Sequence, residues 1–204
     1  RHRMRRGTGL LAVASLLLAG CSSAYYGTIE KLGVHKRDIM VDRVVAARDA
    51  QAEAKEQFLT AMEQFKGVVA FQGGDLEREY HKLDATLKDS EARAADVRER
   101  IAAVEDVSEA LFSEWEGELG QYASNSLRQA SQRKLDTTRR RYTQLLAAMK
   151  KAEARLEPAL VPLRDQVLFM KHNLNARAIA GLSDEVVSVQ ANVDRLVREM
   201  ESVV

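Results

Sequence analysis

The chain has 204 residues, of which 46% are hydrophobic and 30% charged, with two Pro and 5% aromatic residues. A composition rich in Ala, Leu, Glu, Lys and Arg favours long helices over strands. Residues 1–20 hold four Arg and no acid, which leaves 27 basic against 30 acidic residues from Cys21 onward. That balance lacks the basic domain or stripe of a dedicated nucleic-acid binder, so we expect no nucleic-acid partner.

The N-terminal residues have the features of an export signal. Arg5 and Arg6 precede an apolar run over residues 7–20. The run is shorter than the roughly 20 residues that span a bilayer, but it fits the charged and apolar regions of a secretory signal. A buried N-terminal helix that happens to contain a Cys is the alternative. We predict a signal peptide over residues 1–20.

The four residues Leu18-Ala19-Gly20-Cys21 resemble the bacterial lipobox. In proteins with that motif the signal is cut before the Cys, whose thiol and new amine are acylated. We therefore predict Leu18, Ala19 and Gly20 as the signal-peptidase motif and Cys21 as the lipidation site, with palmitate among its acyl groups. Several acyl chains hold a protein on a membrane where one does not.

Residues 21–35 are predicted to be the lipidated N-terminus and a tether. By resemblance to sorting in enteric bacteria, Ser22 after the Cys implies the periplasmic face of the outer membrane. Since Cys21 is the only cysteine, no internal disulfide can form. Tyr25 and Tyr26 suit a lipid headgroup boundary, or else pack on the end of a helical bundle.

The longest heptad pattern runs from Asp75 to Tyr122, where apolar or small residues alternate in steps of three and four. Its members are Tyr80, Leu83, Leu87, Ser90, Ala94, Val97, Ile101, Val104, Ser108, Leu111 and Trp115.

An earlier helix is predicted from Lys36 to Phe71. Its heptad positions are Val44, Ala47, Gln51, Ala54, Phe58, Ala61, Phe65 and Val68. We expect Gly73 and Gly74 to form the turn and Asp75 to be the N-cap of the next helix.

Residues 122–126 are the next expected break, because Ser and Asn compete with helical backbone bonding. A third helix should follow, with seam residues Leu127, Ser131, Leu135, Thr138, Tyr142, Leu145, Met149, Ala152 and Leu156. Pro158 and Pro162 should end or bend it. Two further seams follow, with a break near Gly181 between them. Their members are Leu163, Val167, Met170 and Leu174, and then Val186, Val189, Val193, Leu196, Met200 and Val203.

These patterns predict an all-α fold, an elongated antiparallel helical bundle or coiled coil of three to five long helices. Short turns between long helices make them antiparallel neighbours. We expect residues 36–204 to form a single domain.

No catalytic or metal-binding motif is found in the sequence. None of the histidines has a His or Cys three or four positions away, and no HExxH, P-loop or GxSxG occurs. We expect no enzyme activity, cofactor or metal.

Glu114, Glu116 and Glu118 around Trp115 form an acidic patch, which is either plain surface or a binding site. The basic residues 139–141 and 150–151 suit a solvated face or, alternatively, a lipid headgroup contact.

The segment 171–177 is unusual, because two Asn and a His lower helix propensity just after the apolar run 167–170. If the helix continues, Asn173 and Arg177 lie one turn apart on it. One interpretation is a polar network that fixes helix register. The other is a partner-binding site made of His172, Asn173, Asn175 and Arg177.

Several strings resemble an uncharacterised family of Gram-negative bacterial predicted lipoproteins that is known only as a domain of unknown function. The strings are Tyr25-Tyr26, residues 36–39 and 41–44, Gly73-Gly74, and residues 165–169 with 171–176. The resemblance covers essentially the whole chain after the signal. It implies the protein class and carries no catalytic or ligand assignment.

Two functions agree with these features. The first is an outer-membrane-anchored periplasmic lipoprotein that acts as a structural or adaptor component of the envelope, bound to an envelope protein. The second is a lipid-binding helical rod in membrane remodelling or envelope stress. If the protein is an adaptor, its only expected membrane contact is the N-terminal lipid. A homo-oligomer is compatible with either function.

Overall fold

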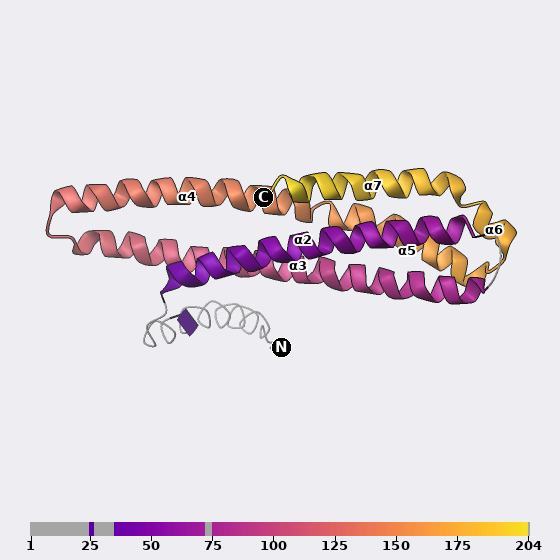
Figure 1. The fold of residues 1–204 in the computed structure, drawn as a ribbon. Helices are drawn as coiled ribbons and strands as arrows, with labels where there is room; N and C mark the ends of the chain where they lie inside the picture. Colours follow the sequence, from indigo (N-terminus) through magenta and orange to yellow (C-terminus); the bar gives the residue numbers. More distant parts are fainter. Residues whose placement is uncertain (1–24, 27–34, 72–74, 204) are drawn as a thin grey trace, which may run out of the picture. The chain divides into compact units, whose positions relative to one another are not determined.

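The computed structural model describes residues 25–26, 35–71 and 75–203 (Figure 1). Within these ranges all regular structure is helical and no strand occurs, which confirms the all-α helical prediction. The predicted signal peptide, lipobox and Cys21 lie outside the described residues, as do Gly73 and Gly74.

The described residues form long helices joined by short connections. In chain order these are α2 (Lys36–Val69), α3 (Leu76–Glu118), the 3₁₀ helix η1 (Leu119–Gln121), α4 (Asn125–Glu153), α5 (Leu156–His172), α6 (Ala176–Ala180) and α7 (Ser183–Glu201).

Two predicted helix starts are confirmed by their caps. The Asp75 carboxylate accepts the backbone N–H of Arg78 at 3.0 Å, so Asp75 caps α3 as expected. At the start of α4, the Ser124 hydroxyl accepts the N–H of Leu127 at 3.4 Å, and the Ser124 carbonyl accepts that of Arg128. Small polar residues therefore end one long helix and begin the next, as residues 122–126 predicted.

The chain forms two compact units. The described part of unit 1 is residues 25–26, 35–43 and 103–139, and that of unit 2 is residues 44–71, 75–102 and 140–203. Helices α2, α3 and α4 contribute residues to both units. That residues 36–204 form one domain stays a prediction.

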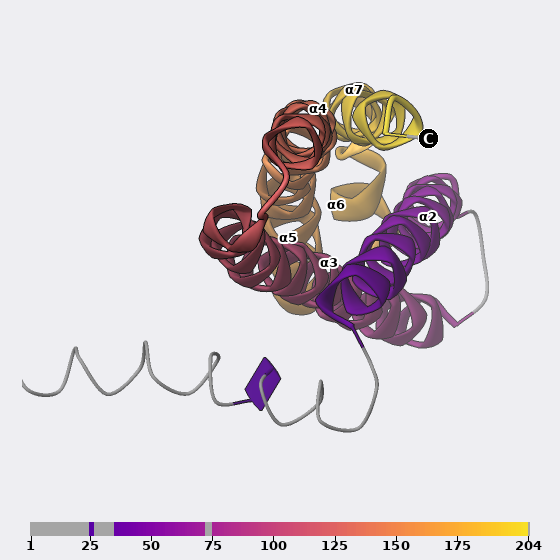
Figure 2. The same cartoon turned by 90° about the vertical axis from the view of Figure 1, so that its left-hand side faces the viewer.

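In unit 2 most of the predicted heptad positions are buried, and Figure 2 shows α2, α3, α4, α5 and α7 in an end-on view. On α3 every predicted seam residue of this unit is buried, namely Tyr80, Leu83, Leu87, Ser90, Ala94, Val97 and Ile101. On α2 the predicted Val44 is only half-buried, and the buried seam residues are Ala47, Gln51, Ala54, Phe58, Ala61, Phe65 and Val68. The Gln57 amide donates to the Thr86 carbonyl at 3.2 Å, and the Gln51 amide to that of Met149 at 3.2 Å. These bonds join α2 to α3 and to α4.

Two seam positions were predicted wrongly. Leu127 is 59% exposed on α4, although its spacing fits the seam. Leu174 is 38% exposed and follows the end of α5, because that helix stops at His172. Spacing alone cannot show whether a neighbouring helix is present to cover an apolar position.

The two prolines also act differently from the prediction. The third helix ends at Glu153, and α5 begins at Leu156, so both Pro158 and Pro162 belong to α5. Pro158 falls in the first turn, where a missing N–H costs nothing. Pro162 lies inside the helix, where proline removes one intrahelical bond. The break near Gly181 is confirmed, since α6 ends at Ala180 and α7 begins at Ser183.

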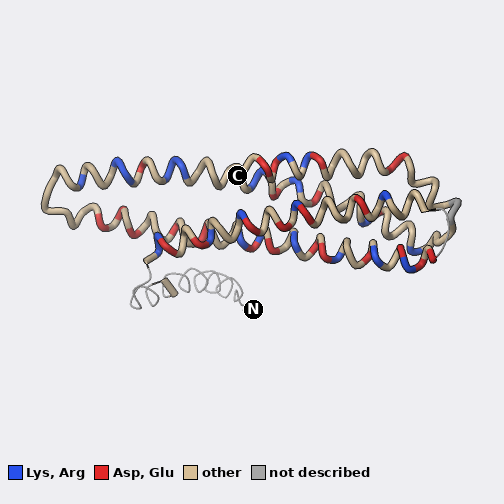
Figure 3. Tube along the Cα trace, viewed as in Figure 1, with Lys and Arg blue, Asp and Glu red and all other residues tan. Residues whose placement is uncertain are grey.

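Unit 1 contains a hairpin of α3 and α4 with opposite charge on its two arms (Figure 3). From residue 103 to 118 the chain has six acidic and no basic residues, and from residue 125 to 139 it has four basic and one acidic. One link across the hairpin is the Arg139 guanidinium, 2.6 Å from the Glu116 carboxylate and over the Phe112 ring. None of residues 119–134 is buried, so the apolar contact between the two arms of the hairpin is small. Attraction between the acidic arm and the basic arm supplements it.

Candidate functional site

Tyr26 is held in unit 1 by a polar cluster that we call the tyrosine clamp, made of Tyr26, Arg43, Ala103 and Asp106. The Tyr26 hydroxyl donates to the Asp106 carboxylate. Arg43 Nη1 donates to the Tyr26 hydroxyl at 2.6 Å and to the Ala103 carbonyl at 2.9 Å. Tyr26 is 0% exposed, whereas Tyr25, packed edge-on against its ring, is 52% exposed. Of the two sequence interpretations, packing on helices is correct for Tyr26.

The clamp fixes the protonation state of Tyr26. Burial, with a further contribution from the hydrogen bond to Asp106, raises the pKa of the Tyr26 hydroxyl to about 12. The phenol therefore stays neutral and remains a donor to Asp106. A buried aromatic residue bonded to two charged side chains is an anchor for the segment that carries it.

The acidic patch around Trp115 is largely used inside unit 1. Glu114 accepts from Lys36 Nζ at 3.0 Å, and the indole N–H of Trp115 donates to the Ser131 hydroxyl at 2.8 Å. The Arg139 hydrogen bond lowers the pKa of the Glu116 carboxyl. Glu114 and Glu116 thus pair with basic residues of the same unit, and whether the patch also binds a partner stays a prediction.

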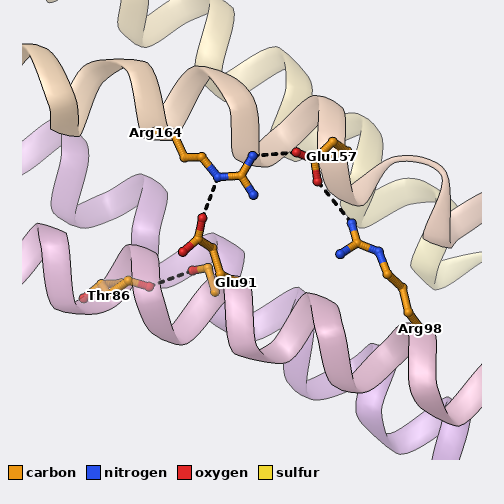
Figure 4. Close-up of polar contacts among 6 residues, drawn as sticks. Thr86, Glu91, Arg98, Glu157 and Arg164 are labelled. Atoms are coloured by element: carbon orange, nitrogen blue, oxygen red, sulfur yellow. Dashed lines mark hydrogen bonds and ion pairs between the residues drawn. The ribbon is translucent and has the colours of Figure 1, made fainter.

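In unit 2 a chain of ion pairs fixes α5 against α3 (Figure 4). Arg164 lies between Glu91 of α3 and Glu157 of α5, with nitrogen–oxygen distances of 2.5 Å to each. Glu157 continues to Arg98 of α3 at 3.2 Å. The pKa of the Glu157 carboxyl is lowered, first of all by the hydrogen bond from Arg164. The pairs therefore supplement the buried apolar side of α5, which orients the helix in unit 2.

With α5 held in this way, part of its apolar surface faces solvent. Leu156, Leu160, Leu163 and Met170 are buried on the inner side. Exposed hydrophobic residues lie elsewhere on the same helix, namely Val161 (44%), Leu168 (58%) and Phe169 (40%). In a helix, four successive apolar residues such as 167–170 cannot all face one side. The run therefore contributes to the core and to the surface.

The predicted partner-binding residues lie at the end of α5. His172 is its last residue and is exposed. Asn173 is the C-cap, with its side-chain amide donating to the Phe169 carbonyl at 2.9 Å. The Asn175 side chain accepts the N–H of Ala178 at 2.8 Å and so caps α6. Of Arg177 only the helical backbone is described.

These contacts correct the helical spacing assumed for residues 171–177. The helix ends at His172, so Asn173 and Arg177 are not one turn apart on the same helix. The two Asn side chains bond to neighbouring backbone instead of forming a network across the bundle. Whether His172, Asn173, Asn175 and Arg177 bind a partner stays a prediction.

The comparisons with known proteins identify the family. A family described as "Protein of unknown function (DUF2959)" matches residues 25–204. The chain belongs to this family. The predicted membership of a domain-of-unknown-function family is thereby confirmed. No curated protein and no solved structure matches the chain.

The described residues lack two further features, a metal site and a membrane span. They hold no group of three or more His, Cys, Asp or Glu placed to bind a metal ion. None of the described helices is both long and apolar enough to cross a bilayer.

Two features of this family member were not predicted, the tyrosine clamp and the exposed side of α5. The apolar run 167–170 was a usable signal for the second. The clamp joins residues 80 positions apart, and no local pattern indicates that.

Proposed function

We propose that this protein is a lipid-anchored structural or adaptor component of the Gram-negative cell envelope, held by acylated Cys21 at the periplasmic face of the outer membrane. The observation that carries the proposal is the tyrosine clamp. Tyr26 follows Cys21 by five residues, which span at most about 18 Å. A lipid on Cys21 is thus coupled to folded helices through a short segment.

The adaptor role is supported by the kind of surface that the chain offers. The outer side of α5 carries large exposed apolar residues, Leu168 and Phe169, beside the exposed His172. Exposed apolar side chains with polar neighbours are typical of protein contacts. We assign the interaction surface to this end of α5.

The anchor is tested by replacing Cys21. Cys21→Ser should abolish both signal cleavage and labelling by a palmitate analogue, because the acceptor thiol is gone. A mutant that still takes up the label would overturn the lipidation site. Tyr26→Ala serves as a matched control that should leave labelling unchanged.

The interaction surface is tested by a photo-crosslinking amino acid placed at Leu168 in intact cells. We expect a discrete protein product there and none from Val187, which is 72% exposed on α7. Absence of any product from Leu168 would contradict the adaptor role.

The second candidate, a membrane-binding protein, is favoured by one observation, the basic and exposed Lys171 close to the exposed apolar residues Leu168 and Phe169. It is distinguished with protein lacking residues 1–21 and anionic liposomes. An adaptor should remain in the supernatant, whereas a lipid binder should sediment with the vesicles, and less so at high salt.

A further inference from the structure

The outer side of α5 has an ordered pattern of apolar and charged residues. Val161, Asp165, Leu168 and His172 follow one another at steps of four, three and four, which places them along one side of the helix. Phe169 lies next to Leu168. All five are exposed, so none of the described helices of unit 2 covers them. We call this set the α5 outer face.

Two polar residues of opposite chemistry flank the apolar centre of the α5 outer face. Asp165 and His172 are seven residues apart, or about 10 Å along a helix. Among the described residues neither side chain has a hydrogen bond or ion pair. A neutral imidazole ring donates a hydrogen bond to a carboxylate through its N–H group. A protonated imidazole ring also carries a positive charge that attracts the carboxylate. The outer face thus presents an acceptor and a donor that no described residue uses.

We propose that the α5 outer face binds the α5 outer face of a second copy of this chain, with the two helices antiparallel about a two-fold axis between Leu168 and Phe169. This arrangement sets Leu168 of each copy against Phe169 of the other. Asp165 of each copy then lies opposite His172 of the other, and the pair occurs twice.

The charge pattern of the α5 outer face favours a second copy of this chain as the partner and an antiparallel direction of the two α5 helices. A two-fold interface is self-complementary, so each residue must suit the residue that symmetry places opposite it. Parallel helices would put Asp165 against its own copy, and like charges in contact oppose association. Antiparallel helices place every Asp165 against a His172. The α5 outer face therefore complements a second copy of itself in the antiparallel orientation only. A homodimer contact is expected to have this property.

This inference deepens the proposed function, because it names the partner of the same surface and rests on that surface being used. A single helix pair is a small interface. We therefore expect a reversible dimer with a dissociation constant on the order of micromolar.

The first test uses sedimentation equilibrium of the full-length lipidated protein in detergent. Leu168→Glu should raise the dimer dissociation constant about 100-fold, since it buries two carboxylates at the centre of the contact. The control is Val187→Glu, at an exposed apolar position on α7, which should leave the constant unchanged. A monomeric wild type, or a dimer indifferent to Leu168→Glu, would overturn the proposal.

The second test exchanges charges between copies. Asp165→Lys alone removes the carboxylate opposite His172, and His172→Asp alone sets an aspartate against Asp165, so each variant should dimerise much more weakly by itself. When the two variants are mixed, the introduced lysine of one copy meets the introduced aspartate of the other, while the natural pair forms on the second side. Dimer should then return as the mixed species. Two folded variants that stay monomeric after mixing would overturn the antiparallel register.

The photo-crosslinker at Leu168 separates this inference from the proposed function. A product that contains only this chain, at twice its mass, supports self-association. A product with a different protein overturns self-association and leaves the proposed adaptor role standing. No product at all would count against both.

Discussion

Unit 2 and unit 1 use different interactions to hold their helices. In unit 2 large apolar side chains, among them Phe58, Phe65, Leu83 and Leu160, are fully buried. The apolar residues buried in unit 1 are fewer, namely Tyr26, Val104, Val107, Phe112 and Leu135. Its helices are joined in addition by the tyrosine clamp and by ion pairs such as Lys36–Glu114 and Arg139–Glu116.

The two kinds of contact stabilise the helices to different extents. Burial of apolar surface contributes roughly 25 cal/mol per Å², whereas exposed ion pairs contribute about 0–1 kcal/mol each. Unit 2 should therefore be the more stable unit. Unit 1, which contains the clamp nearest to the predicted lipid, should open at lower denaturant. Trp115 is the only tryptophan and lies in unit 1, so its fluorescence reports that unit separately.

The largest effect is expected from Phe58→Ala in the core of unit 2. Phe58 is 0% exposed, and such truncations cost about 3–5 kcal/mol of unfolding free energy. The helical signal in circular dichroism should be lost at lower urea, while the Trp115 fluorescence transition moves less. Val187→Ala, at an exposed site, is the control. Equal shifts in both signals would show that the units unfold together.

The next effect is expected from Tyr26→Phe, which keeps the ring and removes the hydroxyl. Hydrogen bonds to charged groups contribute about 1.5–3 kcal/mol, and here the loss should fall on unit 1. We expect the Trp115 transition to move to lower urea, with Tyr25→Phe as the exposed control. A shift confined to the dichroism signal would contradict the assignment of the clamp to unit 1.

The clamp should also make unit 1 sensitive to alkali. The pKa of Tyr26 is raised to about 12 in the folded protein from 10.0 in the unfolded chain. Its contribution is thus complete below pH 10 and is lost as the pH rises through about 12. Trp115 fluorescence should report this loss in the wild type and a smaller one in Tyr26→Phe. Identical alkaline profiles would remove Tyr26 as the cause.

A smaller effect is expected from the cap of α6. Asn175→Ala removes the bond to the Ala178 N–H and should cost about 1 kcal/mol, as lost N-caps do. The dichroism transition should change, and the Trp115 transition should not. Ser188→Ala, exposed on α7, is the matched control. An unchanged variant that has lost its crosslink at Leu168 would place Asn175 in the partner contact.

The smallest effect is expected from Arg164→Gln in the ion-pair chain of unit 2. Its partners are substantially exposed, so we expect a loss of about 1 kcal/mol or less that shrinks further in salt. Because the pKa of Glu157 is lowered from 4.5, its contribution is present above that pH and fades as the pH falls through the lowered value. Acid titration of the dichroism midpoint checks this. A salt-independent loss of several kcal/mol would mean that Arg164 acts through packing.

Local sequence was sufficient for the helices and much of the core. The steps of three and four from Tyr80 to Ile101 identified residues that are all buried, because a helix places such positions on one side. Asp75 and the Ser and Asn of residues 122–126 identified helix starts, since capping is a short-range bond. The same rule failed at Leu127, where the predicted spacing is present and burial is not.

The order of the amino acids was enough to predict that the chain is helical, where most helices begin, and which side of α2 and α3 is apolar. These are properties of a helix and its neighbours within a few residues. The folding of the whole chain decided that Tyr26 bonds to Asp106, 80 positions away, and that Arg164 pairs with Glu91, 73 positions away. It also decided that Leu168 and Phe169 face solvent while Val167 and Met170 do not. The physical reason is that burial and long-range hydrogen bonds depend on which helices come together, and the periodicity of one helix does not specify its neighbours.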